Sequence, residues 1–216
     1  MRLLRWVVGC ALYAAVLFGL SGRLDLPLLW AYWGVGVATG LVLTLTIDPD
    51  LARERRRPAP GGVDRGKRWF FGSLFVAHVV IGLVDAGRYH WSDTVPPATR
   101  IAGLVGYAAA LAWLTWSVAV NRFFSPVVRI QQERGHHLIT RGPYRYVRHP
   151  GYLAMIVLWP ASALALGSWW ALVPALVNVG MVLHRAAVED RYLHEHLTGY
   201  AGYAGTVPYR IVPGIW

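Results

Sequence analysis

Hydrophobic residues in this chain gather into six long runs that are separated by polar segments. The runs cover roughly residues 3–22, 29–47, 69–87, 98–120, 152–167 and 170–188. Most of them come close to the ~20 residues that a helix needs to cross the hydrocarbon layer of a bilayer. Only residues 167–169 separate the last two runs, so we expect a tight helical hairpin there. The pattern predicts an all-α fold, a polytopic membrane helix bundle with about six transmembrane helices.

The composition agrees with a membrane protein rather than with an average soluble domain. Of the 216 residues, 56% are hydrophobic and 15% are charged, and the mean hydropathy is +0.39. The first run resembles a signal peptide, but no convincing small-residue cleavage site follows it and five further runs do. We therefore interpret the first run as a helix that stays in the chain.

The net charge of +10 comes from cations that flank the apolar runs. If the N-terminus lies inside, all Lys and Arg residues except Arg23, Arg88 and Arg100 fall in inner segments. Because positively charged loops stay in the cytoplasm, we expect both termini on the cytosolic side. Cations in these places contact lipid headgroups, so we expect membrane lipids as partners and no nucleic acid. The abundance of Arg, Gly and Ala indicates a bacterial inner membrane.

Several polar features carry weaker signals. The segment from Ala52 to Arg68 is rich in Pro, Gly and Arg, which suits a solvated, mobile inner loop without a catalytic role. His78 and Asp85 share a face of the third run. Ionisable groups inside a membrane are functional candidates, but Asp85 lies near the outer end and can reach water, so their role stays open. Cys10 is the only cysteine, and no histidine pair has helical metal-ligand spacing, so we expect no metal.

The segment between the fourth and fifth runs is too long for an ordinary connector. It reads PVVRIQQERGHHLITRGPYRYVRHP from Pro126 to Pro150, and the apolar residues spread through it argue against disorder. We expect it to fold back on the cytoplasmic face as a small cap. Pro150 suits the first position of the fifth helix, which places Arg148 and His149 at an N-terminus that favours anions. Alternatively, the cations and tyrosines here are interfacial anchors.

Two further charged residues, Arg185 and Glu189, are expected close to Arg148 and His149. Arg185 and Glu189 are four residues apart at the end of the sixth run, so they share one helical face. Because the fifth and sixth helices form a hairpin, the start of one meets the end of the other. We therefore expect Arg148, His149, Arg185 and Glu189 to converge at the cytosolic interface, although a simple surface ion pair is the alternative.

An ordered set of motifs here resembles a known family. The set comprises Gln131, GHHLIT, GPYRYVRHPGY, a helical hairpin, Arg185, Glu189-Asp190, Leu193 and GYAGYAGTVPYRIVPGIW. Over roughly residues 121–216 it is similar to the isoprenylcysteine carboxyl methyltransferase family and its phospholipid N-methyltransferase relatives. The chain departs in having Glu-Asp where many relatives have Glu-Glu, and Ala154 where a glycine is common. We divide the chain into four N-terminal transmembrane helices, residues 1–120, and a methyltransferase core of cap, hairpin and tail, residues 121–216.

The resemblance implies an S-adenosylmethionine-dependent methyltransferase with its cofactor pocket at the cytosolic face. Arg185 matches the substrate-contacting arginine of the family. By the same resemblance, the residues that would line the cofactor are Gln131, His136, His137, Leu138, Ile139, Tyr144, His149, Pro150, Gly151, Tyr152 and Glu189. The partner it implies is a lipophilic small molecule or lipid substrate, and no metal is required.

The nature of the acceptor follows from its ionisation. A carboxylate is already charged at neutral pH and needs only to be oriented, whereas a lipid amine must first lose a proton. This favours carboxyl O-methylation of an isoprenylcysteine-like substrate over N-methylation of a phospholipid amine.

Two other classes of protein stay open. An NADPH-dependent membrane reductase of the sterol type shares an R-H-P-x-Y-like element, but the spacing from that element to Arg185 and Glu189 suits the methyltransferase better. A lipid-binding or scaffold protein would carry Arg185 and Glu189 only as an ion pair. The tail from Gly199 to Trp216 is expected to pack across the cap as a lid or to serve as an interfacial aromatic anchor.

Overall fold

The computed structural model describes residues 2–64 and 68–216, and this part of the chain is all-helical with no strand. Six helices are long and apolar: α1 (Arg2–Ser21), α2 (Pro27–Thr46), α4 (Arg68–Val84), α5 (Pro97–Val120), α6 (Pro150–Leu166) and α7 (Leu172–His196). Two helices are short: α3 (Pro49–Arg56) and α8 (Tyr200–Thr206). A π-helical turn, η2 (Asp85–Tyr89), extends α4, and the 3-10 turns η3 (Gln132–Arg134) and η4 (Gly142–Arg145) lie between α5 and α6.

Each of the six predicted spans corresponds to a helix. Five of them, α1, α2, α4 with its π turn, α5 and α7, are long and apolar enough to cross a bilayer. The sixth, α6, is equally apolar but has only 17 residues, with Pro160 inside it. The chain is an integral multi-pass membrane protein, and its all-helical class agrees with the prediction from the sequence.

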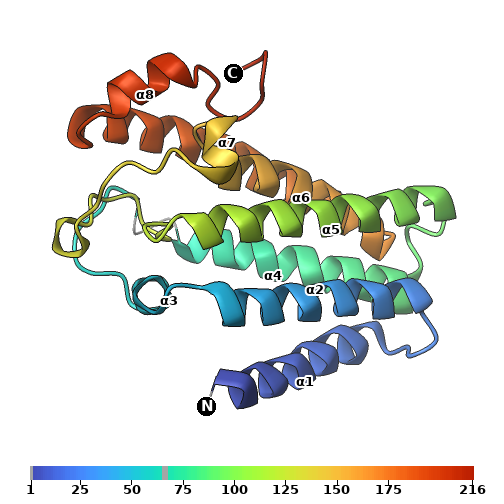
Figure 1. The fold of residues 1–216 in the computed structure, drawn as a ribbon. Coiled ribbons are helices and arrows are strands. Elements are labelled where there is room, and N and C mark those ends of the chain that lie inside the picture. The colour runs from blue at the N-terminus through green and yellow to red at the C-terminus, as the bar shows by residue number, and fades with distance from the viewer. Residues whose placement is uncertain (1, 65–67) are drawn as a thin grey trace.

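The long helices run up and down the bundle in chain order (Figure 1). As a result, α3, the segment between α5 and α6, α8 and both ends of the described chain lie at the same end of the molecule (Figure 1). The loops that join α1 to α2, α4 to α5 and α6 to α7 lie at the other end. This topology collects the polar segments that follow α2, α5 and α7 on one face.

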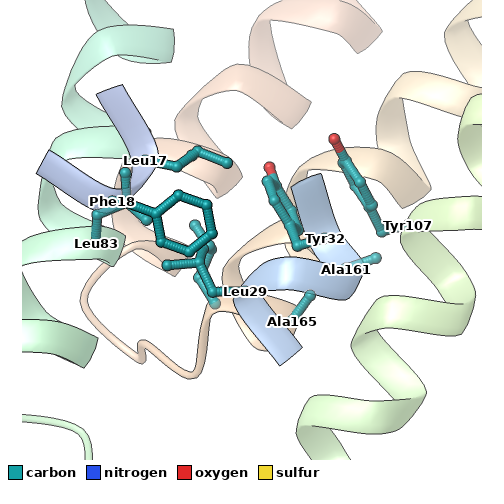
Figure 2. Close-up of a cluster of buried hydrophobic side chains, with 9 residues drawn as sticks. Leu17, Phe18, Leu29, Tyr32, Leu83, Tyr107, Ala161 and Ala165 are labelled. Carbon is teal, nitrogen blue, oxygen red and sulfur yellow. The ribbon is translucent and has the colours of Figure 1, made fainter. Parts of the chain in front are cut away.

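One cluster of buried side chains joins five of the long helices (Figure 2). Leu17 of α1, Leu29 of α2 and Leu83 of α4 pack together there, and the rings of Tyr32 and Tyr107 stack with their centroids 4.3 Å apart. Small residues of α6, such as Ala161 and Ala165, let its backbone come close to α5. The core therefore packs α1, α2 and α4 against α5 and α6. The segment between α5 and α6 lies at the end of the bundle that gathers the polar segments, which is called the polar end below.

His78 and Asp85 are both held by hydrogen bonds inside the bundle. The two ring nitrogens of His78 lie 3.1 Å from the carbonyl oxygen of Ala171 and 2.8 Å from the Ser162 hydroxyl. Asp85 accepts hydrogen bonds from the hydroxyl groups of Ser92 and Ser168. Because a buried polar group without a partner is costly, these bonds explain how both residues fit in a membrane bundle. Their contacts join α4 to the α6–α7 turn and lie away from the polar end.

The close approach of α5 and α6 predicts a stability effect at Gly103. A Cβ atom at this position would lie 2.6 Å from the Ala165 nitrogen and 2.9 Å from the Ala161 carbonyl oxygen, which are backbone atoms that cannot move aside. We expect Gly103→Ala to destabilise the fold by about 1–3 kcal/mol. Gly9→Ala is the matched control, since a Cβ atom there meets nothing within 4 Å. Thermal unfolding in detergent, followed by tryptophan fluorescence, should show a lower Tm for Gly103→Ala alone, and equal Tm values would contradict this packing.

Candidate functional site

The chain between α5 and α6 folds into a cap at the polar end of the bundle. Gln131 is buried, and its side-chain amide donates to the carbonyl oxygen of Phe123 (2.8 Å) while its backbone N–H donates to Nδ1 of His136 (3.2 Å). Gly135 and Gly142 take left-handed backbone conformations, with φ of 63° and 61°, and these let the cap turn sharply on itself. The cap is therefore an ordered structure with its own internal hydrogen bonds.

A buried ion cluster fastens the cap to the segment that follows α2. The Arg129 guanidinium lies 2.9 Å from one oxygen of Glu54 and 2.6 Å from one oxygen of Glu133, and Ser125 also donates to Glu54. Asp48 caps the N-terminus of α3, which carries Glu54. The prediction that residues 52–68 form a solvated loop is wrong for this part, because Glu54 and Asp64 are buried against the cap. Residues 65–67 lie outside the described chain.

Asp190 is the centre of the second ion cluster, which lies between α6, α7 and the tail. Its carboxylate, 1% exposed, accepts hydrogen bonds from Nε of Arg148 (2.9 Å) and Nε of Arg210 (2.8 Å), and from the Tyr200 hydroxyl (2.8 Å). Nε2 of His149 lies 3.1 Å from the same carboxylate. The sequence motif contains Asp190, but no role was predicted for it. The structure shows that it joins the start of α6 to the end of α7.

The tail packs over the cap, as one of the two predictions for it proposed. The backbone N–H groups of Arg148 and His149 donate to the carbonyl oxygens of Tyr209 and Arg210. The Tyr203 hydroxyl donates to the Tyr144 carbonyl oxygen at 2.6 Å. The buried apolar side chains that seal this contact are Leu197, Tyr200, Tyr203 and Val207, with Ile130, Leu138 and Leu193 against them.

A cleft lies between the cap, the start of α6, the end of α7 and α8. It holds about 790 Å³ of empty space when the open solvent at its mouth is counted. Nine of the residues predicted from the family resemblance line it: His136, His137, Leu138, Ile139, Tyr144, His149, Gly151, Tyr152 and Glu189. Gln131 and Pro150 do not line it, because Gln131 is buried inside the cap and Pro150 is buried at the first turn of α6.

The walls of the cleft are mostly aromatic and apolar, with one carboxylate. Burial raises the pKa of Tyr144 above its ordinary value, so this phenol stays protonated, and its oxygen accepts a hydrogen bond from the Asn121 side chain (2.8 Å). The His136 ring stacks on Phe123 with their centroids 4.5 Å apart. Asn121 and Phe123 were not predicted from the sequence. Glu189 is half-buried and brings a negative charge to the wall.

Arg185 lies outside this cleft but is connected to it. The Tyr152 hydroxyl donates to Glu189 and accepts from Nε of Arg185 at 2.8 Å, so one phenol bridges the two charged residues. The simple Arg185–Glu189 ion pair considered above is thus replaced by a bridged arrangement. Arg185 lines a separate, mainly apolar groove of about 1150 Å³ between α4 and α7, together with Phe70, Phe71 and Met181.

Arg148 has a structural role rather than the anion-binding role that its sequence position suggested. Its side chain is 7% exposed and donates to Asp190 and to the carbonyl oxygens of Val207 and Pro208. Those bonds occupy most of the guanidinium, which therefore holds the tail to the hairpin. The predicted convergence of Arg148, His149, Arg185 and Glu189 at one end of the hairpin is nevertheless observed.

The Asp190 cluster predicts a large loss of stability when its charge is removed. In Asp190→Asn the buried Arg148 would lose its counter-charge, which typically costs about 3–5 kcal/mol. We expect a strongly reduced Tm in detergent. Asp25→Asn, which breaks an ion pair with Arg23 at the protein surface, should leave the Tm unchanged and serves as the control. A Tm for Asp190→Asn equal to that of the wild type would show that the cluster does not hold the cap and tail together.

His136 is predicted to stay neutral well below its ordinary titration range. Burial, and then the positive neighbours His137, Arg129 and Arg134, lower its pKa to about 4. Since the unfolded chain takes up this proton near pH 6.5, the folded state loses stability as the pH falls from about 6.5 to about 4. NMR titration of the histidine ring protons, with His136→Gln to identify the signal, should give a midpoint near 4. A midpoint above 6 would mean that the ring is solvated.

Comparison with known proteins agrees with this geometry. Residues 102–195 match the family model described as the isoprenylcysteine carboxyl methyltransferase (ICMT) family. Two curated relatives, from Oryza sativa subspecies indica and japonica, are each named probable protein-S-isoprenylcysteine O-methyltransferase and are 48% identical over 40 residues. That stretch is 18% of this chain and 21% of each relative, so the match spans about a fifth of the length of the curated relatives.

The fold is also similar to a solved structure. The eukaryotic intramembrane Ras methyltransferase ICMT (isoprenylcysteine carboxyl methyltransferase), solved without a monobody, aligns with a TM-score of 0.53 and 15% identity. The alignment covers 97% of this chain and 75% of that one. The family match begins in α5, before the predicted core boundary at residue 121, and ends before the tail. The resemblance to the isoprenylcysteine carboxyl methyltransferase family is therefore confirmed, in sequence for residues 102–195 and in fold for nearly the whole chain.

Proposed function

We propose that this chain is an S-adenosylmethionine-dependent membrane methyltransferase that methylates the carboxylate of a lipophilic, isoprenylcysteine-like acceptor. The observation that carries this proposal is the bridge from Glu189 through Tyr152 to Arg185. It joins a cleft suited to a polar cofactor with an apolar groove that has the cation Arg185 in its wall. A transfer between a water-soluble donor and a greasy anionic acceptor requires such a pair of sites in contact.

The cleft fits S-adenosylmethionine by the chemistry of its walls. The aromatic surface around Tyr144 and His136 suits a stacked base, and the Glu189 carboxylate suits an ammonium group. His137, Leu138 and Ile139 complete the cap side of the wall, and Gly151 lets the Phe124 ring pack against the start of α6, where a Cβ atom would lie 2.5 Å from that ring. Gln131 and Pro150 would act indirectly, by holding the cap and the helix start in place. When bound, the cofactor supplies a methyl group already activated on a sulfonium centre.

The residues around Arg185 would orient the acceptor. Arg185 is always protonated and offers a planar set of N–H donors, which matches the geometry of a carboxylate. The groove beside it is lined by Val177, Gly180 and Phe70 and can take an apolar chain from the bilayer side. A carboxylate oxygen needs no general base, so the task of the protein is alignment in a site from which water is excluded. Methyl transfer would form an oxygen–carbon bond on the acceptor and break a sulfur–carbon bond of the donor, which would leave a neutral ester and a neutral thioether.

The charge distribution supports an orientation for the site. The cap and α3 are rich in Arg, and they lie with the tail at one end of the bundle, together with both ends of the described chain (Figure 1). By the positive-inside rule this end faces the cytosol, which we propose to be that of a bacterium with the protein in its inner membrane. We further propose that residues 121–216 form the catalytic core and that residues 1–120 mainly provide its membrane support.

Substitutions at Glu189 and Arg185 should separate cofactor binding from turnover. We expect Glu189→Ala to weaken binding of S-adenosylhomocysteine by about 100-fold or more, because it removes the charge facing the ammonium group. Arg185→Ala should bind S-adenosylhomocysteine like the wild type but lose turnover with an isoprenylcysteine acid. Calorimetric titration of detergent-purified protein measures the first effect and methyl transfer the second.

Two controls make this comparison decisive. Glu195→Ala removes an exposed carboxylate near the end of α7 and should change neither quantity. NADPH as a parallel ligand tests the reductase alternative and should not bind. Equal affinity for S-adenosylhomocysteine in the wild type and Glu189→Ala would contradict the assigned role of Glu189, loss of binding in Arg185→Ala would contradict that of Arg185, and binding of NADPH alone would contradict the proposed activity.

A further inference from the structure

Arg185 already has an anionic partner that the family motifs do not include. Oδ2 of Asp64 lies 2.9 Å from a terminal nitrogen of Arg185, and the two side chains are 5% and 14% exposed. Asp64 belongs to the segment between α3 and α4, to which the sequence assigned no catalytic role. Both residues line the apolar groove between α4 and α7. A carboxylate of the protein itself therefore occupies the polar end of that groove.

The remaining bonds of Arg185 hold its guanidinium in place. Nε donates to the Tyr152 hydroxyl, and the other terminal nitrogen donates to the Pro126 carbonyl oxygen at 2.8 Å. Arg55 adds a further positive charge nearby, since burial and then the charge of Arg185 lower the pKa of Arg55. Of these partners, Asp64 is the one that carries a full negative charge in direct contact. An incoming carboxylate would have to share the guanidinium with Asp64 or displace it.

The two oxygens of Asp64 have different roles. Oδ1 accepts a hydrogen bond from the Val128 backbone N–H at 2.9 Å, and the adjacent Val63 donates to the Val128 carbonyl oxygen at 3.2 Å. These bonds fix the backbone of this segment against the cap. Only Oδ2 faces Arg185, so the ion pair can open while the bond to Val128 remains. The bond from Val128 anchors the Asp64 side chain, whereas the ion pair with Arg185 can be exchanged for another anion.

We propose that Asp64 is a specificity-determining residue that stands in for the acceptor carboxylate at Arg185 and competes with it. This inference rests on the proposed function, because it assumes that Arg185 receives an acid. Two carboxylates at one guanidinium repel each other strongly in a site with little water. An acid therefore binds only if its apolar chain also fills the groove and offsets the displacement of Asp64. Short or poorly fitting anionic amphiphiles are rejected by the same contact.

The test is the substitution Asp64→Asn, which keeps an oxygen for Val128 and removes the charge that faces Arg185. The probes are an N-acetylated S-farnesylcysteine and its carboxamide, titrated in non-ionic detergent in the presence of S-adenosylhomocysteine. We expect the acid to bind about tenfold more tightly to Asp64→Asn than to the wild type, and the amide to bind both equally. Asp50→Asn, in α3, removes a half-exposed acid that pairs with Arg53 and Arg122 and should change neither affinity.

Each other outcome has a distinct meaning. Unchanged or weaker binding of the acid to Asp64→Asn would overturn the competition, as would equal gains for acid and amide or failure of the acid to bind either protein. Asp64→Ser, a second substitution that removes the charge, must reproduce the gain if the lost charge causes it. Failure of the proposed function is seen separately, since wild-type protein would then not bind S-adenosylhomocysteine when that ligand alone is titrated.

Discussion

The carboxylate of Asp190 is the interaction on which the polar end of this molecule depends. It lies in the last third of α7 and accepts hydrogen bonds from Arg148 at the start of α6, Tyr200 in α8 and Arg210 in the tail. Buried charges of this kind are tolerated only when they are paired and hydrogen-bonded. Removing one partner leaves the other charge buried without compensation, which lowers the stability of the fold. This constraint fixes where the hairpin, the cap and the tail lie relative to one another, and the cleft is the space between them.

The other ion cluster, around Arg129, fixes the opposite side of the cap to α3. The bridge through the Tyr152 hydroxyl connects the aromatic-walled cleft, which carries Glu189, with the apolar groove that carries Arg185. Under the proposed function, such an arrangement would hold a water-soluble ligand in the cleft and a lipid-soluble ligand in the groove, with Glu189 and Arg185 on either side of the Tyr152 hydroxyl. Asp64 determines which acids bind at Arg185, because it pairs with Arg185 until an acid whose apolar chain fits the groove displaces it.

Much of this architecture can be predicted from the sequence, for physical reasons. Hydrophobic runs predict the six helices because a bilayer demands about 20 apolar residues per span, and α6 fell short only in length. The spacing of Arg185 and Glu189 predicts a shared face because it matches one helical turn. The roles of Asp64 and Tyr152 could not be predicted in the same way, since they arise from contacts between distant segments. The composition of residues 52–68 predicted a solvated loop, and this was wrong around Glu54 and Asp64. Both acids are buried against cationic partners, which composition alone does not reveal.

The central claim is that the cleft under the cap binds the methyl donor, and hydrogen exchange measured by mass spectrometry tests it most directly. Detergent-purified protein would be compared with and without saturating S-adenosylhomocysteine, with NADPH as the parallel ligand. Our account predicts slower exchange in the cap, residues 130–149, and in residues 197–208, with no change in α1 and α2 and no effect of NADPH. Protection confined to other segments, or protection by NADPH alone, would contradict it.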